Sequence, residues 1–366
     1  MYKELLYQIN KQFENSEQLS SPEYKVESHV YDLATKNYWN AILNLRHVIR
    51  LACDNFFAYE KSGINVDLFM ITPSVSSPMG PGSDSEAIPI KFGNLETFLV
   101  DSSQFGFEPI LMNDFDLLYC YLPSMRGEDP DKRHLNQFYH CEAELKGNLN
   151  DVIKLVEDYI KSITNSLYEV SSLVSCLSLS PEHSIGTMQT IIKTENFKKI
   201  TFDLAVKTLE EHGHSKYINY TDRGRDISSQ GEIELAKIIS PSAPFWITHF
   251  DRDRVPFYQK PNPENKNQTL NADLIFPPLI ETSFGGEIVG CGQRQDTESE
   301  CYESLDRQNL SKSQYDWYIS LRGMPEYKTT SGFGMGVERY ITWLLCRDDI
   351  KNSIPYPRLK NITTLP

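Results

Sequence analysis

The segment "SGFGMGVERYITWLLCRDD" at residues 331–349 predicts a glycine-rich strand followed by an amphipathic helix. Its first part alternates glycine with larger residues, at Gly332, Gly334 and Gly336. In an extended strand these glycines share one face, so that face lacks side chains and leaves room above it. A helical pattern follows from Val337, and Arg339 lies about 200° around the helix from it. The arginine therefore points away from the core at a helix start, where free N–H groups favour an anion.

A second segment, "LLYCYLPSMRGEDPDKRHLNQFYHCEAEL" at residues 117–145, predicts a long hairpin with a charged loop. Strand alternation gives its returning strand two different faces. One face is apolar, with Tyr139, Cys141, Ala143 and Leu145, and the other holds Phe138, His140, Glu142 and Glu144. Alternation alone fits a solvent-facing sheet as well as it fits a ligand site.

Arg126 and Glu128 share a face of this hairpin. An arginine suits a phosphate or a carboxylate, because its planar guanidinium makes two parallel charge-assisted hydrogen bonds. Phe138 offers a ring on which a purine base can stack, and His134 in the loop can meet terminal phosphates. These residue types indicate a nucleotide site, although the glycine spacing at residues 332–336 matches neither GxxxxGK[ST] nor GxGxxG.

The segment "NADLIFPPLIETSFGGEIVGCGQRQ" at residues 271–295 carries two carboxylates in strand-like surroundings, Asp273 and Glu287. Nearby glycines let a ligand or another backbone approach closely. Two carboxylates beside an arginine-bound polyphosphate suit Mg²⁺, which takes few oxygen ligands from protein and the rest from water and phosphate. Taken alone, the segment fits a β-bulge with surface acids better.

The composition of the 366-residue chain is that of a globular protein, with 40% apolar and 23% charged residues. Its net charge of −14 gives nucleic acid no long-range attraction, which disfavours tRNA as a partner. The seven cysteines contain no CxxC pair and predict reduced, mostly buried thiols. No apolar run reaches the roughly 20 residues of a membrane span, and the first residues begin no secretory signal. We therefore expect a cytoplasmic protein with no membrane partner.

The order of the patterns predicts an α+β fold. Strand-rich segments at 95–145 and 244–294 flank a mainly helical middle region at 150–240. Residues 1–35 are polar and rich in serine and glutamate, and they predict an N-terminal extension that is a linker or a loosely attached arm. Residues 36–366 are then expected to form one domain.

Two of these segments resemble signature motifs of the class II aminoacyl-tRNA synthetases. "MRGED" with "KRHLNQF" is similar to the second motif, and "GFGMGVER" is similar to the third. Further segments resemble the aspartyl/asparaginyl branch and its asparaginyl type, namely "DSSQFGFE", "RHLNQFYHCEAE", "GGEIVGCGQRQ" and "IPYPR". The resemblance covers roughly residues 36–360. It implies an antiparallel sheet flanked by helices, and amino-acid activation by ATP with Mg²⁺.

The resemblance also implies roles at the nucleotide end of a site. Arg126 would grip the α-phosphate and the amino-acid carboxylate, and Arg339 would hold the γ-phosphate; these are the two candidate catalytic residues. Glu128 would read the adenine amino group and Phe138 would stack on adenine. His134 would meet the outer phosphates.

Metal and amino-acid contacts follow from the same resemblance. Glu287, with Asp273 behind it, would bind Mg²⁺. The amino-acid pocket would be lined by Ser102, Gln104, Glu142 and Arg294. Arg294 would face the carbonyl of the substrate side chain.

The chain departs from the pattern of this branch in three places. Only about 35 residues precede the resemblance, whereas the branch carries an anticodon-binding domain of roughly a hundred residues there. The glutamate expected before Phe138 is Gln137, which questions the polarity of the pocket. "LIETSF" at residues 279–284 resembles a short insertion and questions the role of Asp273.

The choice between asparagine and aspartate depends on Phe107 and Glu108. Aspartyl enzymes carry a lysine three residues beyond the pocket glutamine, where this chain has Phe107, and asparaginyl enzymes have a glutamate after it, as here. Asparagine is therefore predicted first and aspartate second.

We therefore predict an ATP-dependent, adenylate-forming ligase that passes asparagine or aspartate to an acceptor other than tRNA. Three alternatives stay open. The protein is an asparagine synthetase that uses aspartate, ATP and ammonia, a truncated asparaginyl-tRNA synthetase, or a catalytically inactive paralogue with a binding or regulatory role.

The apolar helix pattern at 40–57 and the strand "LFMITP" after it resemble the first class II motif. This resemblance implies a homodimer that uses the helix. A Gly/Pro/Ser loop, "SVSSPMGPGSDSE" at residues 74–86, is expected to follow the strand.

Overall fold

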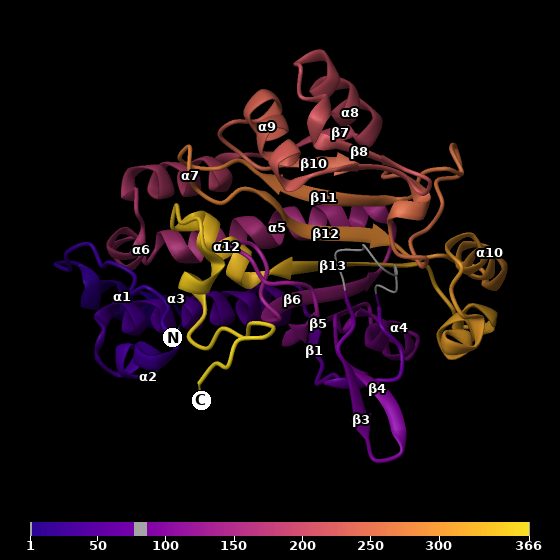
Figure 1. Ribbon diagram of the computed structural model, residues 1–366, viewed down its shortest axis with the longest axis horizontal. Coiled ribbons are helices and arrows are strands. Elements are labelled where there is room, and N and C mark those ends of the chain that lie inside the picture. Colours follow the sequence, from indigo (N-terminus) through magenta and orange to yellow (C-terminus); the bar gives the residue numbers. More distant parts are fainter. Residues whose placement is uncertain (1, 77–85, 366) are drawn as a thin grey trace.

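An eight-stranded sheet forms the centre of the molecule (Figure 1). The computed structural model describes residues 2–76 and 86–365, so most of the predicted Gly/Pro/Ser loop, residues 77–85, lies outside the described residues. The strand order is β1-β5-β6-β13-β12-β11-β10-β7. In that order the strands are Ile64–Asn65, Leu117–Met125, Gln137–Lys146, Thr330–Gly336, Gly286–Gln293, Asn271–Phe276, Phe245–Thr248 and Lys198–Thr201.

The predicted antiparallel sheet and α+β class are confirmed, with one difference at the edges. The short edge strands β1 and β7 pair in parallel with their neighbours. The strand pairs between them are antiparallel.

Strand register places the glycines of β13 directly beside the polar side chains of β6. Gly332, Gly334 and Gly336 pair with Glu144, Glu142 and His140 respectively. On the other side of β13, Gly290 and Gly292 of β12 continue the bare surface. At these positions, one face of the sheet has two neighbouring strands without side chains beside a third strand that carries polar ones.

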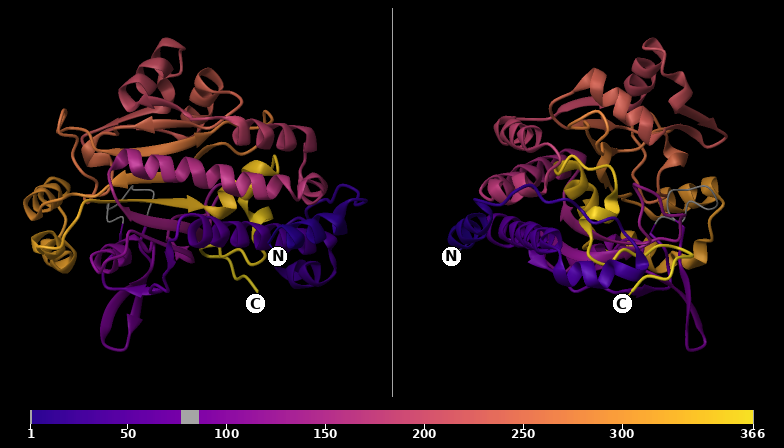
Figure 2. Two further views of the ribbon diagram at one scale, coloured as in Figure 1. Left: turned by 180° about the vertical axis from the view of Figure 1, so that it is seen from behind. Right: turned by 60° about the vertical axis from the view of Figure 1, so that its left-hand side comes forward.

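The other face of the sheet is apolar and packs against helices. Three helices contribute most to this layer, α3 (Asn37–Asp54), α5 (Leu149–Tyr168) and α12 (Val337–Leu344). Seen from behind, α5 lies across the sheet with α3 beside it (Figure 2). The apolar side of α5 faces the strands, because its hydrophobic residues recur at helical spacing.

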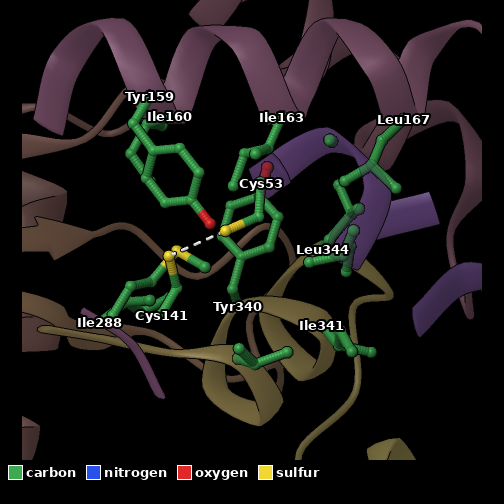
Figure 3. Packing of buried hydrophobic residues seen from close by; sticks show 14 of the residues in the cluster. Cys53, Cys141, Tyr159, Ile160, Ile163, Leu167, Ile288, Tyr340, Ile341 and Leu344 are labelled. Atoms are coloured by element: carbon green, nitrogen blue, oxygen red, sulfur yellow. Dashed lines mark hydrogen bonds between the residues drawn. The ribbon is translucent and has the colours of Figure 1, made fainter. Parts of the chain in front are cut away.

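Figure 3 shows the packing of this layer. The hydroxyls of Tyr340 on α12 and Thr164 on α5 share a hydrogen bond of 2.8 Å. The Sγ atoms of Cys53 on α3 and Cys141 on β6 lie 3.3 Å apart as thiols. All seven cysteines are buried and free, as the sequence predicts.

The region between α5 and β10 is mainly helical with short strands. Its elements are α6 (Ser171–Leu177), α7 (Pro181–Lys193), β7, α8 (Phe202–Glu211), β8 (Ile218–Thr221), β9 (Gly224–Ile227) and α9 (Ser229–Ile239). Helix α8 packs on β7 and β10 at the β7 edge of the sheet, whereas α9 packs on β11 and β12 (Figure 1). The remaining elements are β2 (Ile71–Thr72), β3 (Pro89–Phe92), β4 (Leu95–Leu99), α4 (Phe107–Leu111), α10 (Glu298–Gln308) and α11 (Asp316–Ile319).

The prediction that residues 1–35 form a linker or a loosely attached arm is wrong. This segment forms two helices, α1 (Tyr2–Phe13) and α2 (Val26–Thr35). Helix α1 is amphipathic, and its apolar side belongs to the main core and packs on α6. The polar composition therefore reflects the solvent face of packed helices.

Candidate active site

A cavity of about 580 Å³ lies over the bare face of the sheet. Its size is typical of a site for a nucleotide-sized ligand with a small co-substrate. The structure brings together all eleven residues that the sequence singled out, because each of them lines this cavity. They are Ser102, Gln104, Arg126, Glu128, His134, Phe138, Glu142, Asp273, Glu287, Arg294 and Arg339.

Arg126 and Phe138 form one wall of the cavity. Arg126 directly follows β5, and its guanidinium carbon lies 5.3 Å from the centre of the Phe138 ring. Its buried Nε has no hydrogen-bond partner among the described residues. Asn136 fixes the backbone here, since its Nδ2 donates to the carbonyl oxygens of Arg126 at 2.8 Å and Glu128 at 2.7 Å. The arginine is thus held in place with donor capacity left for a ligand.

Two more cations face this end of the cavity. Arg339, in the first turn of α12, donates to the Glu287 carboxylate at 3.1 Å. Arg133 donates to the carbonyl of Gly285 at 2.6 Å and stacks 4.2 Å from the centre of the Phe284 ring. Burial, and then the charge of Arg339, lower the pKa of Arg133 to about 10. Like charges this close favour an anion between them.

Three carboxylates lie opposite these cations. Oxygens of Asp273 and Glu287 converge over Gly290, where each is 3.3 Å from the position a Cβ would take. Burial, and then the charge of Glu287, raise the pKa of Asp273 well above its usual value. Glu232 of α9 accepts a hydrogen bond from the backbone N–H of Glu287 at 2.9 Å. Burial, and then Glu287, raise the pKa of Glu232 to about 8.

These carboxylates fit Mg²⁺ bound together with phosphate. Among the residues that the structure describes, no three His, Cys, Asp or Glu side chains form a ready metal cage. Two converging carboxylates are nevertheless the donor set that Mg²⁺ uses when phosphate and water supply the remaining oxygens. A cation here would also relieve the repulsion that raises the pKa of Asp273.

The other end of the cavity holds a buried carboxylate, Glu142, in a polar cradle. The Ser102 hydroxyl and the backbone N–H of Ser103, at 2.9 Å, donate to its two oxygens. Burial raises the pKa of Glu142, and the hydrogen bonds oppose that shift. Gln104 donates through Nε2 to the hydroxyl of Tyr258. This end offers acceptors suited to an ammonium group.

Arg294 and Glu144 form a two-pronged ion pair beneath this end. Arg294 donates through Nε at 2.8 Å and through Nη2 at 2.7 Å, and both side chains are buried. Burial alone would lower the pKa of Arg294, but the Glu144 carboxylate raises it above its usual value. A Cβ on Gly332 would overlap Glu144 Oε2 and lie 2.7 Å from Arg294 Nη2. The pair therefore exists because β13 is bare at this position.

Comparison with known proteins identifies the family of the chain. The family model described as tRNA synthetases class II (D, K and N) matches residues 21–360. The chain belongs to this family. The predicted family and enzyme class, a class II synthetase-like ligase, are thereby confirmed.

Curated relatives of this class II synthetase chain are asparagine–tRNA ligases. A probable cytoplasmic asparagine–tRNA ligase of Encephalitozoon cuniculi is 27% identical over 315 residues, which are 85% of this chain and 65% of that protein. The asparagine–tRNA ligase of Koribacter versatilis is 27% identical over 329 residues, 87% of this chain and 68% of that one. The synthetase chain thus spans about two thirds of the length of these relatives.

Solved structures share the fold. The asparaginyl-tRNA synthetase of Pyrococcus horikoshii, complexed with asparaginyl-adenylate, aligns with a TM-score of 0.82 at 21% identity and covers 94% of this chain and 74% of that one. The Entamoeba histolytica asparaginyl-tRNA synthetase, also with asparaginyl-adenylate, has a TM-score of 0.77 at 22% identity and covers 95% of this chain and 74% of that one.

None of the helices described in this synthetase chain is long and apolar enough to cross a membrane.

Two residues predicted to decide specificity in this synthetase chain lie outside the cavity. Phe107 is fully buried in a separate apolar cluster with Leu111, Leu118 and Cys120. Glu108 is paired with Arg322 at 2.7 Å, and both side chains are buried. The comparison at Phe107 therefore says nothing about the charge of the cavity, because short helix α4 turns this side chain into the core.

Two other doubts are removed by strand geometry. Gln137 lies on the opposite face of β6 from Glu142 and lines a separate surface groove, so it does not alter the polarity of the cavity. The segment 279–284 lies in the turn between β11 and β12, whereas Asp273 pairs with Gly290 inside the strands. The insertion instead supplies Phe284, on which Arg133 stacks.

Sequence reasoning missed several cavity residues. Arg133 stood beside His134 in a quoted segment, and a second cation in that loop was a usable signal. His140 was placed on the correct strand face without a role. It bonds through Nδ1 to the Ser124 hydroxyl at 2.9 Å, and burial, then Arg126 and Arg339, lower its pKa well below the usual value. Glu232 and Gln259 carried no local signal.

We predict that Gly332→Ala lowers the free energy of unfolding by about 1–3 kcal/mol, as expected for overpacking. The added methyl group displaces the buried Glu144–Arg294 pair. Urea denaturation followed by circular dichroism measures the change. Gly186→Ala is the matched control, because a Cβ there meets open space in α7. Equal stability of Gly332→Ala and the native chain would contradict the assignment.

We also predict a pH dependence from Glu232. Its raised pKa means that the folded state keeps a proton that the unfolded state loses, so stability falls as pH rises from about 4.5 to about 8. Glu232→Gln removes this proton uptake and makes the fall shallower by up to about 1.4 kcal/mol per pH unit. Denaturation series at pH 5 to 8, without Mg²⁺ or nucleotide, measure it. Parallel profiles for both proteins would show that the prediction fails.

Proposed function

We propose that this synthetase domain activates asparagine with ATP, forming asparaginyl-adenylate and pyrophosphate. One observation carries the proposal. A single cavity joins an end with arginines, carboxylates and an aromatic ring to an end with a buried carboxylate and a charge-neutral Arg–Glu pair. The first end has the chemistry for Mg²⁺-ATP, and the second has the chemistry for an amino acid with a neutral polar side chain.

The proposed reaction needs no protein nucleophile. A carboxylate oxygen of asparagine attacks the α-phosphorus of ATP, and the bond between that phosphorus and its bridging oxygen breaks. Pyrophosphate leaves with the electron pair. Arg126, whose Nε is unpartnered among the described residues, stabilises the negative charge that develops on the α-phosphate.

Other groups of the cavity position the two substrates. Phe138 stacks on the adenine, and Glu142 binds the α-ammonium group of the amino acid. His134 and Arg339 hold the outer phosphates. Such positioning makes the attack intramolecular in effect. Asp273 and Glu287 would hold Mg²⁺, which supplies charge neutralisation on the phosphates.

Asparagine fits the amino-acid end better than aspartate. Glu144 occupies Nε and Nη2 of Arg294, so the pair is neutral overall. An aspartate side chain would add a buried negative charge beside Glu144 and Glu142, whereas an amide adds none. This argument replaces the one from Phe107 and supports the same substrate.

The acceptor of the second step is proposed from the relatives. They are named asparagine–tRNA ligases, which supports tRNA as the acceptor better than the non-tRNA acceptor predicted from the sequence. The net charge of −14, which disfavours tRNA at long range, does not exclude it, because a local basic surface suffices for docking. Incubation with ATP, labelled asparagine and total tRNA tests the acceptor. Charging of tRNA supports tRNA, and adenylate formation without charging supports another acceptor.

We predict that Arg126→Ala and Arg339→Ala each reduce asparagine-dependent ATP–pyrophosphate exchange by at least about 100-fold, because each removes charge stabilisation at the phosphates. The fold is expected to persist in both variants, as judged by circular dichroism. Arg307→Ala is the control, since this arginine pairs with Asp253 on the surface outside the cavity. Full exchange by either cavity variant would refute the proposed site.

We further propose a homodimer that uses α3. A groove of about 330 Å³ runs beside this helix and is lined by apolar and aromatic residues together with Arg46, His47, Arg50 and Gln137. Leu43, one of its apolar residues, is 50% exposed. We predict that the native chain sediments as a dimer at micromolar concentration, and that Leu43→Asp weakens the dimer at least about tenfold by placing a charge in the interface. Leu204→Asp on α8, 45% exposed, is the control. A monomeric native chain that retains activity would contradict the proposal.

A further inference from the structure

Gln259 lies at the amino-acid end of the cavity, in the segment between β10 and β11. Its backbone forms an antiparallel bridge with Arg294, so the two side chains are neighbours. The side-chain amide lies over Gly292 of β12. A Cβ on Gly292 would overlap Gln259 Oε1 and lie 2.7 Å from its Cδ. The second bare strand therefore makes room for this amide, as β13 does for the Glu144–Arg294 pair.

The amide oxygen of Gln259 is buried and has no hydrogen-bond partner among the described residues. A buried acceptor without a donor costs free energy unless something supplies that donor. The neighbouring Arg294 does not supply it, since its Nε and Nη2 donate to Glu144. An unpaired acceptor in the wall of a binding cavity points to a ligand group that carries an N–H.

We propose that Gln259 is a specificity-determining residue, whose Oε1 accepts a hydrogen bond from the side-chain amide N–H of the amino-acid substrate. This inference rests on the proposed function and deepens it. A primary amide carries one acceptor oxygen and two N–H donors. Arg294 offers donors to the oxygen, and Gln259 beside it offers an acceptor to the nitrogen. Together they match both halves of an asparagine side chain.

The same arrangement disfavours aspartate. An ionised carboxylate has only acceptors, so one of its oxygens would face the Gln259 oxygen without a proton between them. A site that hydrogen-bonds a substrate N–H rejects analogues that lack it, because its own buried group is then left unpaired. Gln259 thus adds a directional criterion to the charge criterion set by Arg294 and Glu144.

The test is a cycle of one protein change and one substrate change, measured by ATP–pyrophosphate exchange. The protein change is Gln259→Met, which keeps the length of the side chain and removes the amide. The substrate change replaces asparagine by 2-amino-4-oxopentanoate, its methyl-ketone isostere, which keeps the carbonyl and loses the N–H groups. Aspartate is the third substrate. Gln189→Met, on the surface of α7, is the matched control.

We expect the native chain to prefer asparagine over the ketone by about 10- to 100-fold in kcat/KM, the range for one unpaired buried group. In Gln259→Met this preference falls to within about threefold, because KM for asparagine rises. KM for ATP stays unchanged. The preference for asparagine over aspartate also falls. A purely packing role of Gln259 would lower all activities without changing these ratios.

Two results overturn the inference while the proposed function stands. One is equal activity of the native chain with the ketone and with asparagine. The same result is expected if the Gln259 amide is rotated so that its N–H₂ group faces the substrate. The other is an unchanged preference in Gln259→Met. If Gln259→Met does not fold, the comparison of asparagine with the ketone in the native chain is sufficient to decide. Exchange with another amino acid and none with asparagine overturns both the inference and the proposed function.

Discussion

The site depends on the absence of side chains at four glycine positions of two adjacent strands. Register aligns Gly332 and Gly334 of β13 with Glu144 and Glu142 of β6, and aligns Gly292 and Gly290 of β12 with the same glycines. Any Cβ at Gly332 or Gly292 would overlap a polar group that lines or supports the cavity. The bare surface is therefore already used twice by the protein's own polar groups, and the space above it remains for a ligand.

Much of the cavity wall is costly for the folded chain alone. Asp273 and Glu232 are half-buried carboxylates with raised pKa values, and Arg133 is a half-buried cation with a lowered one. Arg126 and Gln259 each keep a buried polar atom without a partner in the described part of the chain. Such groups are destabilising unless a ligand pairs them. Their presence in the wall of one cavity supports the proposal that they serve binding and catalysis.

The sequence predicted the sheet class and the cavity residues where a regular period applies. Alternation along β6 separated Glu142 from Cys141, and helical spacing placed Arg339 away from the core. Prediction from the sequence failed where tertiary packing decides the direction of a side chain or the packing of a segment. Phe107 turns into the core on one short helix, and residues 2–13 pack as an amphipathic helix although their composition is polar. Glu232 and Gln259 reach the cavity from elements with no recognisable motif, so only the folded chain identifies them.

The most direct test of the account is ATP–pyrophosphate exchange by the native protein with each of the twenty amino acids and Mg²⁺. The account predicts exchange with asparagine well above that with any other amino acid, aspartate included, because the neutral Arg294–Glu144 pair suits an amide. Exchange that is strongest with aspartate would contradict the account and favour an asparagine synthetase. No exchange with any amino acid would contradict activation altogether.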